Sequence, residues 1–307
     1  MKRSTEWHFG LFLLVITCCV QALAEAPVPE QAVIEVPFEL IRGEIIVPVT
    51  VNGAGPFWML LDSGVDPSVV ELGTAKSVGL KIAAKGHQGD GGGTSRNLAY
   101  ETSLPIVQLG AFTATKIDAL ATDLSKISTK LGRPIGGILG YSLFKKRIVQ
   151  IDYPNRKVRF NANAPSCVGA ADSSPECTKL SFRYKNEILA TGVTVDGKPV
   201  ITHVDTGSNS YFQLTPAAVD KLGLSEDVAH AQESSSVGFN GDLKNREGTV
   251  SNVMVGTISR NDPTVVFFGK GMGMDKELWD LRIGSAFLKD FVVTLDYRHG
   301  LITLSAP

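Results

Sequence analysis

Short stretches in which apolar and polar residues alternate cover much of this chain. Residues 49–53, VTVNG, alternate and run into an Asn-Gly pair, and residues 193–197, VTVDG, do the same with an Asp-Gly pair. Alternation is typical of half-buried strands, and both pairs favour the tight turn of a hairpin. Helical spacing indicates one helix near residues 72–78 and another near residues 216–222. The pattern predicts a mainly β protein with one helix in each half.

The chain also repeats itself at an offset of 143 to 144 residues. Each hairpin turn is followed by an apolar stretch that ends in an acidic triplet, FWMLLDSG with Asp62 and VITHVDTG with Asp205. Later blocks match as well, GGILGYSLF with Gly140 and LRIGSAFLK with Gly284. The strands after them, IVQIDYPNRKVRF and VVTLDYRHGLITL, keep that register. Matched blocks in one order predict two copies of one structural unit.

The repeat sets the expected domain boundaries. We expect a first lobe over residues 34–163, a polar linker over residues 164–178 and a second lobe over residues 179–307. Residues 1–24 are interpreted separately, as a signal peptide.

These first residues have the three parts of a cleaved signal. Lys2 and Arg3 precede the apolar run FGLFLLVITCCV, and Ala22-Leu23-Ala24 follows it. The run has 12 residues, short of the roughly 20 that cross a bilayer as a helix. We therefore expect export to the periplasm or the medium, with no stable membrane insertion after cleavage. A retained anchor, or lipidation at a cysteine of the run, is the alternative.

Two cysteines remain after such a cleavage, Cys167 and Cys177 in the predicted linker. An oxidising compartment would join them, which would stabilise the fold by roughly 2–3 kcal/mol. Two free thiols are the alternative. The five histidines are scattered and none has ligand spacing from these cysteines, so we expect neither a metal nor another cofactor.

Composition narrows the possible partners. The 307 residues are 43% hydrophobic and 20% charged, enough to bury a substantial core. The formal net charge is -1 and Lys and Arg form no block, so nothing would neutralise a phosphate backbone. Nucleic acid is not an expected partner.

The two acidic triplets are the candidate chemistry. They are Asp62-Ser63-Gly64 and Asp205-Thr206-Gly207, with Ser208 after the second. Glycine permits close approach of the chain, and the Ser and Thr hydroxyls can hydrogen-bond across the junction between the two loops. If the halves pack about a pseudo-twofold axis, the two carboxylates meet there.

Two carboxylates that meet a few Å apart would share one proton and titrate as a unit. The ionised member could activate a water while the protonated member donates to a substrate carbonyl, which supplies acid and base catalysis together. Neither a metal nor a covalent intermediate is required. The alternative is that both triplets are only turns of a structural β protein, but isolated turns need not recur in register.

With these paired blocks, the chain resembles the pepsin-like and retropepsin-like aspartic peptidases, in particular bacterial exported members. The resemblance extends from about residue 34 to residue 307. It implies a mainly β, bilobal acid protease fold of two homologous β-barrel lobes with the active site between them. It also implies an aspartic endopeptidase that binds a peptide or protein substrate in the inter-lobe cleft. One chain supplies both halves, so a monomer would suffice. The rival is a catalytically inactive peptide-binding protein on the same fold.

Several residues depart from the family pattern. Val65 follows the first triplet whereas Ser208 follows the second, so we expect ionised Asp62 to receive fewer local hydrogen bonds, which would raise the lower apparent pKa of the pair. Arg282 replaces an expected aliphatic residue before Gly284, and we expect it to be solvated. His203 shares a strand face with Asp205 by alternation, and we expect a structural role for it.

A substrate-covering hairpin, or flap, is implied by the resemblance in the stretch GHQGDGGGTSRNLAYETS. Its candidates are Gly91, Gly92, Gly93 and Tyr100, and we expect Tyr100 in the stem rather than at the tip. The second-lobe counterpart, QESSSVGFNGDLKNREG, is polar and is interpreted as an ordinary surface hairpin.

Overall fold

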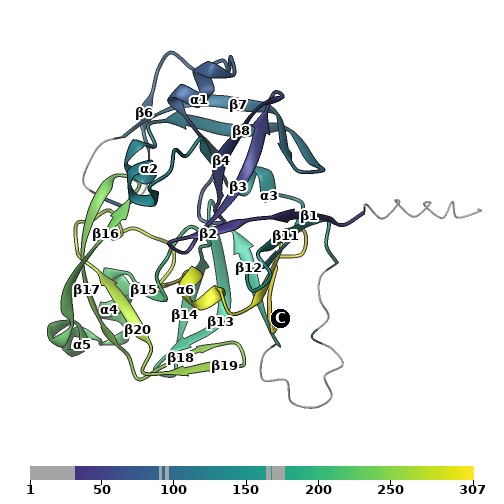
Figure 1. Cartoon of the computed structure of the whole chain (residues 1–307). Coiled ribbons are helices and arrows are strands. Elements are labelled where there is room, and N and C mark those ends of the chain that lie inside the picture. Colours follow the sequence, from purple (N-terminus) through teal and green to yellow (C-terminus); the bar gives the residue numbers. More distant parts are fainter. Residues whose placement is uncertain (1–31, 90–91, 94–96, 164–166, 168–176) are drawn as a thin grey trace, which may run out of the picture. The chain divides into compact units, whose positions relative to one another are not determined.

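The computed structural model describes residues 32–89, 92–93, 97–163, 167 and 177–307 (Figure 1). The predicted signal peptide, Gly91 and most of the predicted linker lie outside these described residues. The described part of Ala32–Pro307 belongs to one compact unit. It is mainly β with two similar halves, as expected.

The first half is an eight-stranded sheet in the order β2-β3-β4-β9-β5-β8-β7-β6. Its strands are β2 (Glu39–Ile41), β3 (Glu44–Val51), β4 (Ala54–Leu61), β5 (Ser68–Glu71), β6 (His87–Gln88), β7 (Leu98–Leu109), β8 (Phe112–Thr122) and β9 (Gly137–Leu139). Asn52 and Gly53 turn β3 into β4 with positive φ angles of 52° and 78°, which an Asn-Gly pair tolerates. The helices are α1 (Leu72–Ser77), α2 (Ser125–Leu131) and α3 (Tyr141–Phe144).

The second half repeats this plan. Its strands are β13 (Ile188–Val195), β14 (Lys198–Val204), β15 (Phe212–Leu214), β16 (Gln232–Gly238), β17 (Gly241–Thr249), β18 (Asn252–Val255), β19 (Ile258–Asn261), β20 (Thr264–Phe268) and β21 (Leu281–Ile283). The helices are α4 (Pro216–Leu222), α5 (Ser225–His230) and α6 (Ser285–Leu288). Asp196 and Gly197 form the equivalent turn, at φ 48° and 74°. Thr215 caps α4 by accepting a hydrogen bond from the Ala218 amide.

Strands from both halves then pair with each other. The strands are β1 (Ile34–Pro37), β10 (Ile148–Asp152), β11 (Lys157–Phe160), β12 (Cys177–Tyr184), β22 (Val292–Asp296) and β23 (Leu301–Ser305). They hydrogen-bond in the order β1-β11-β10-β22-β23-β12. At the centre Gln150 pairs with Thr294, its own equivalent 144 residues away, and its Nε2 donates to the Thr294 hydroxyl at 3.2 Å. The pseudo-twofold axis therefore passes between these two residues.

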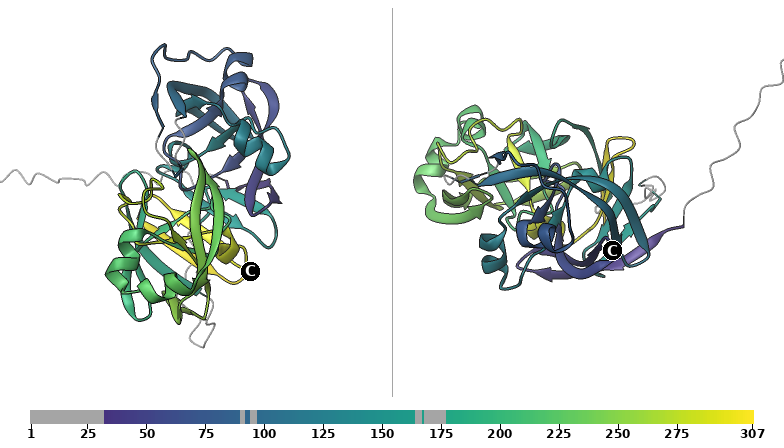
Figure 2. Two further views of the ribbon diagram at one scale, coloured as in Figure 1. Left: turned by 90° about the vertical axis from the view of Figure 1, so that its left-hand side faces the viewer. Right: turned by 90° about the horizontal axis from the view of Figure 1, so that it is seen from above.

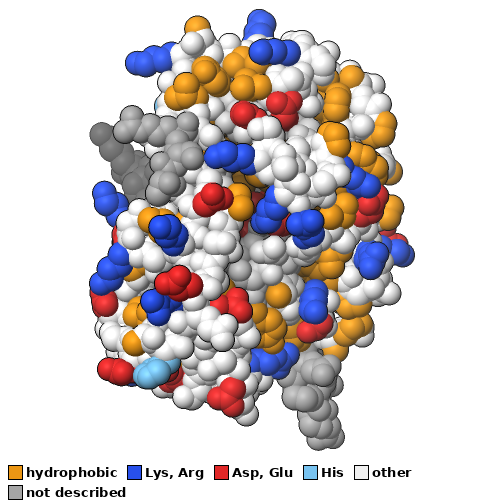
Figure 3. Space-filling view, turned by 60° about the vertical axis from the view of Figure 1, so that its left-hand side comes forward, with side chains coloured by type: hydrophobic (Ala, Val, Ile, Leu, Met, Phe, Trp, Pro, Cys, Tyr) orange, Lys and Arg blue, Asp and Glu red, His pale blue; other side chains and the backbone are white. Residues whose placement is uncertain are grey.

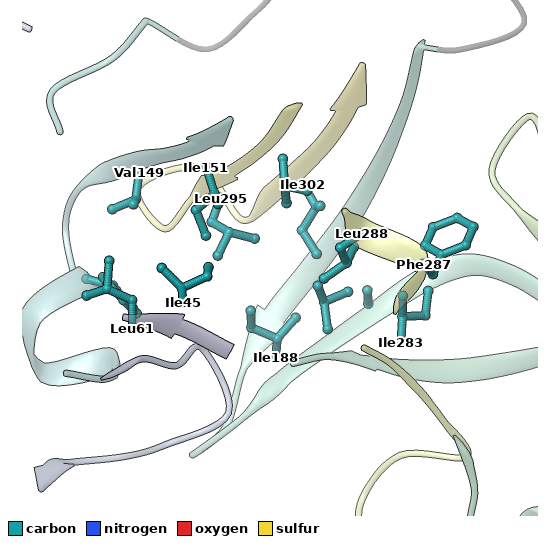
Figure 4. Close-up of a cluster of buried hydrophobic side chains, with 14 of the residues drawn as sticks. Ile45, Leu61, Val149, Ile151, Ile188, Ile283, Phe287, Leu288, Leu295 and Ile302 are labelled. Atoms are coloured by element: carbon teal, nitrogen blue, oxygen red, sulfur yellow. The ribbon is translucent and has the colours of Figure 1, made fainter. Parts of the chain in front are cut away.

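One hydrophobic core joins the halves. Ile45 and Leu61 from the first half lie near Ile188 from the second, with Ile151 and Leu295 from the paired central strands close by (Figure 4). All are buried. Because this core is shared, the loops at the ends of β4 and β14 are held against each other.

Outside the core, charged side chains of both signs are interspersed on the face that Figure 3 shows.

Cys167 and Cys177 form a disulfide with Cα atoms 5.9 Å apart, as predicted. No helix among the described residues is long and apolar enough to span a membrane.

Candidate active site

Each aspartate of the two triplets directly follows the second strand of a hairpin. That strand pairs with another strand that runs parallel to it. In the first half β4 runs parallel to β9, and the Asp62 amide donates to the Leu139 carbonyl at 3.0 Å. In the second half β14 runs parallel to β21, and the Asp205 amide donates to the Ile283 carbonyl at 3.0 Å. The repeated sequence blocks thus build the same support under both aspartates.

The two loops hold each other through a symmetric set of hydrogen bonds. The Ser63 amide donates to the Thr206 hydroxyl oxygen at 2.9 Å, and the Thr206 amide donates to the Ser63 hydroxyl oxygen at 3.0 Å. Each hydroxyl in turn donates across to the other loop, to Val204 O at 2.8 Å and to Leu61 O at 3.1 Å. All four groups are buried, so the loops have little freedom to separate.

The glycines of the triplets let the carboxylates approach. A Cβ on Gly64 would lie 2.6 Å from Oδ1 of Asp205, and a Cβ on Gly207 would collide with the Asp62 carboxylate. Each glycine amide donates instead to the aspartate of its own triplet, at 2.7 Å for Asp62 and 2.9 Å for Asp205. Asp62 and Asp205, only 8% and 7% exposed, therefore face each other across the axis.

The surroundings raise the pKa of Asp62. Burial is the largest cause, and the negative charge of Asp205 and a hydrogen bond to its carboxylate act in the same direction. Within the pair, these effects favour the protonated form of Asp62.

Asp205 differs because Arg282 lies beside it. Nε of Arg282 is 3.3 Å from Oδ2 of Asp205, an ion pair without hydrogen-bond geometry. Burial is the largest single effect and would raise the pKa of Asp205, but the positive charge of Arg282, with smaller contributions from His203 and from hydrogen bonds to Asp62 and the Gly207 amide, lowers the pKa overall. The expectation that Arg282 is solvated was wrong, because its side chain is 20% exposed and packs beside the carboxylate.

His203 has the structural role expected from the sequence. Its Nδ1 lies 3.1 Å from the Ile188 carbonyl, and its ring stacks on Trp279 with centroids 5.8 Å apart. Burial lowers the pKa of His203 to about 4, so the imidazole is neutral at neutral pH.

The local hydrogen bonds do not produce the difference between the two aspartates. The Ser208 hydroxyl donates to Oε1 of Gln213 at 3.0 Å and not to Asp205. Each carboxylate accepts one hydrogen bond from the glycine amide of its own triplet. The prediction that Ser208 and Val65 would make the hydrogen bonding of the two aspartates unequal is therefore wrong. The lower pKa of the pair belongs to Asp205 and is lowered by Arg282, the opposite of the expected rise.

This geometry agrees with a comparison to known families. A family model described as aspartyl protease matches residues 47–143 and 191–287, two segments 144 residues apart that contain one triplet each. The chain belongs to the aspartyl protease family. The bilobal, β-rich fold predicted from the sequence is thereby confirmed. No curated protein matched the chain.

In this member of the aspartyl protease family a third carboxyl group, Glu44, lies near the pair. Glu44 begins β3, is 4% exposed, and its Oε2 has no hydrogen-bond partner among the described residues. Burial raises the pKa of Glu44 to about 8, and its charge would help to raise that of Asp62. Sequence reasoning missed Glu44, although an acidic residue at the head of the apolar run EIIVPVTV was a usable signal.

The flap candidates are only partly described. Tyr100 lies in β7, where it pairs with Ala121 of β8, one residue beyond the Ala99–His87 pair of β7 with β6. The Gly93 amide donates to the Met272 carbonyl at 3.0 Å, and the Asn240 amide donates to the Gly92 carbonyl at 2.8 Å. Both bonds join the first-half hairpin to the second half.

The second-half hairpin is therefore more than a surface feature, and that interpretation was wrong. Its turn, at Phe239 and Asn240, meets the first-half hairpin, and Phe239 packs against a buried cluster of the first half. Asn240 Nδ2 also donates to the Gly89 carbonyl at 3.1 Å. Figure 2 shows this long green hairpin reaching toward the blue first half. The polar composition of the second-half hairpin did not indicate that its turn contacts the first half in the folded protein.

No group of three or more metal-ligating side chains is present in the described part of the chain.

Proposed function

We propose that this protein is an aspartic endopeptidase that hydrolyses peptide bonds with a water activated between Asp62 and Asp205. The observation that carries the proposal is the pair of buried carboxylates held face to face by symmetric loops. Like charges so placed oppose folding, and such an arrangement is typical of a site that uses the shared proton. The family membership supports the same reaction.

The proposed reaction needs both members of the pair. A water bound between them attacks the carbonyl carbon of the peptide bond, one carboxylate takes a water proton, and the other carboxyl donates its proton to the carbonyl oxygen. The resulting geminal diol collapses as the C–N bond breaks. The leaving nitrogen takes the proton held by the first carboxyl group, and the diol hydroxyl returns a proton to the second.

We propose a peptide or protein as the substrate, bound over the two loops. One chain carries both carboxylates, which supports action as a monomer. The Cys167–Cys177 disulfide supports export to an oxidising compartment, the periplasm or the medium.

Incubating the full chain with a mixed peptide library over a range of pH, beside Asp62→Asn and Asp205→Asn, tests the proposal. We expect the wild-type protein to cleave and each variant to lose at least about 10²-fold in kcat/KM, the usual contribution of a catalytic acid or base. Cleavage that survives both substitutions would exclude this mechanism. Peptide binding without cleavage at any pH would show the inactive binding protein instead.

A further inference from the structure

Arg282 is built into the site rather than attached to its edge. Its guanidinium lies over the Trp279 ring, 4.7 Å from the centroid, and 5.7 Å from that of Phe268. Its Nη1 lies 3.5 Å from Oε1 of Gln213, a buried side chain. Aromatic stacking and this amide fix the direction of the planar guanidinium, so its charge stays at one side of Asp205.

Among the described residues of the first half, no cation takes the corresponding place. Arg282 pairs with His203 across β21 and β14, and the residue that occupies its place across β9 and β4 is Ile138. Ile138 is buried in an aliphatic cluster. Asp62 therefore has a hydrocarbon neighbour where Asp205 has a positive charge.

We propose that Arg282 is a positioning residue that fixes the roles of the two carboxylates, holding Asp205 as the general base and leaving Asp62 to carry the shared proton. This assignment rests on the proposed function. In the step described above, Asp205 then accepts the water proton and Asp62 donates to the carbonyl oxygen. Without Arg282 the halves would be nearly equivalent and either carboxylate could take either role.

The other titratable groups described around Asp205 supply no positive charge at neutral pH. They are His203 on β14, Asp62 on the facing loop, Glu44 on β3, and the buried phenols Tyr153 and Tyr297 after β10 and β22. His203 is neutral at neutral pH, and burial holds Glu44 protonated up to about pH 8. Arg282 is accordingly the cation of this group that acts on the pair over the whole working range.

The test compares Arg282→Gln, which removes the charge and keeps a polar side chain, with Arg282→Lys, which keeps the charge. Arg183→Gln, the same change at an exposed strand position, is the matched control. For each protein the pH dependence of kcat/KM is measured, because its acid limb reports ionisation of the free pair. A nearby opposite charge lowers a carboxyl pKa by roughly 1–3 units.

We expect the acid limb of Arg282→Gln to move up by about 1 to 3 pH units, and the basic limb to move less. Arg282→Lys should restore most of the wild-type profile, and Arg183→Gln should match the wild type. An equal loss of activity at every pH in both Arg282 variants would overturn the proposal, because it would show a purely structural role.

A second readout does not need activity. Because the charge of Arg282 helps to keep Asp205 ionised below its usual pH range, the stability lost in Arg282→Gln should increase as pH rises from about 3 to about 6. A loss independent of pH would contradict the assignment. A wild-type protein that shows this pH-dependent loss yet cleaves no peptide would refute the proposed function while upholding the charge assignment.

Discussion

Asp62 and Asp205 occupy equivalent loops with equivalent hydrogen bonds, but the side chains behind the loops differ in kind. In the first half these are aliphatic, and in the second they are polar or aromatic. By strand register the matched pairs are Leu60 and His203, Val69 and Gln213, Ile135 and Trp279, and Ile138 and Arg282. The two loops that carry the carboxylates are thus symmetric, whereas the side chains packed behind the loops are not.

The difference shows how a duplicated fold can make two identical groups unequal. The loops must stay symmetric, because each hydroxyl of the Ser63 and Thr206 network needs its counterpart. The layer behind them has no such constraint, and the positive charge that Arg282 places there helps to separate the pKa values of the pair.

The largest effect that we expect concerns Glu44, the buried carboxyl group whose ionised form would act on Asp62. Its pKa of about 8 lies above the ordinary value of 4.5, so the native state loses stability as pH rises between these values. The slope is about 1.4 kcal/mol per pH unit, or up to about 4 kcal/mol between about pH 5 and pH 8. Denaturant unfolding of Glu44→Gln should lack this loss. A parallel decline in wild type and variant would show that Glu44 does not titrate in this range.

The two aspartate variants should differ in stability as well. Asp205→Asn leaves the Arg282 charge without its partner and should destabilise the protein by about 2–3 kcal/mol, less than for a fully buried pair because the arginine is partly exposed. Asp62→Asn replaces a protonated, uncharged carboxyl group by an uncharged amide and should leave stability nearly unchanged. Denaturant unfolding at neutral pH measures both. Equal losses would contradict the asymmetry.

The symmetric part of the comparison predicts equal effects. Ser63→Ala and Thr206→Val each remove one hydroxyl that accepts one hydrogen bond and donates another, so each should destabilise by about 2 kcal/mol. The double variant should lose less than the sum, because the two groups share partners. Thermal and denaturant unfolding of the three variants form a complete cycle. A clear inequality between the single variants would show that the loops are not equivalent.

The smallest effect concerns the two hairpins. Phe239→Ala removes a half-buried ring that packs against the first half, at roughly 1 kcal/mol. Hydrogen exchange of the Asn240 amide, which is bonded to the Gly92 carbonyl, should become faster. Val237→Ala, an exposed position of the same hairpin, is the control. Unchanged exchange in Phe239→Ala would mean that the ring does not hold the contact.

Much of the fold was predictable because both copies of the repeat can be recognised from short sequence blocks. The triplets, the turns at Asn52 and Asp196 and the strands that pair at Gln150 all lie in matched blocks, and each block specifies its own structure. The pairing of Asp62 with Asp205 followed from symmetry alone.

The surroundings of the pair were not predictable in the same way. The side chain of Arg282 reaches Asp205 because β21 lies parallel to β14 and Trp279 supports the guanidinium, which are both tertiary facts. A usable signal was present, since Arg282 stands where the first copy has Ile138. The contact of Phe239 with the first half also depends on two distant hairpins meeting, and no local pattern encodes it.

The central claim, that Asp205 is the ionised member and Asp62 the protonated one, is tested most directly by a 13C NMR titration of the aspartate carboxyl carbons. The two resonances are assigned by their absence from Asp62→Asn and Asp205→Asn. We predict that the Asp205 carbon stays at its ionised shift below the usual range for aspartate, while the Asp62 carbon stays at its protonated shift well above that range. Ionisation of Asp62 before Asp205 as pH rises would contradict the account.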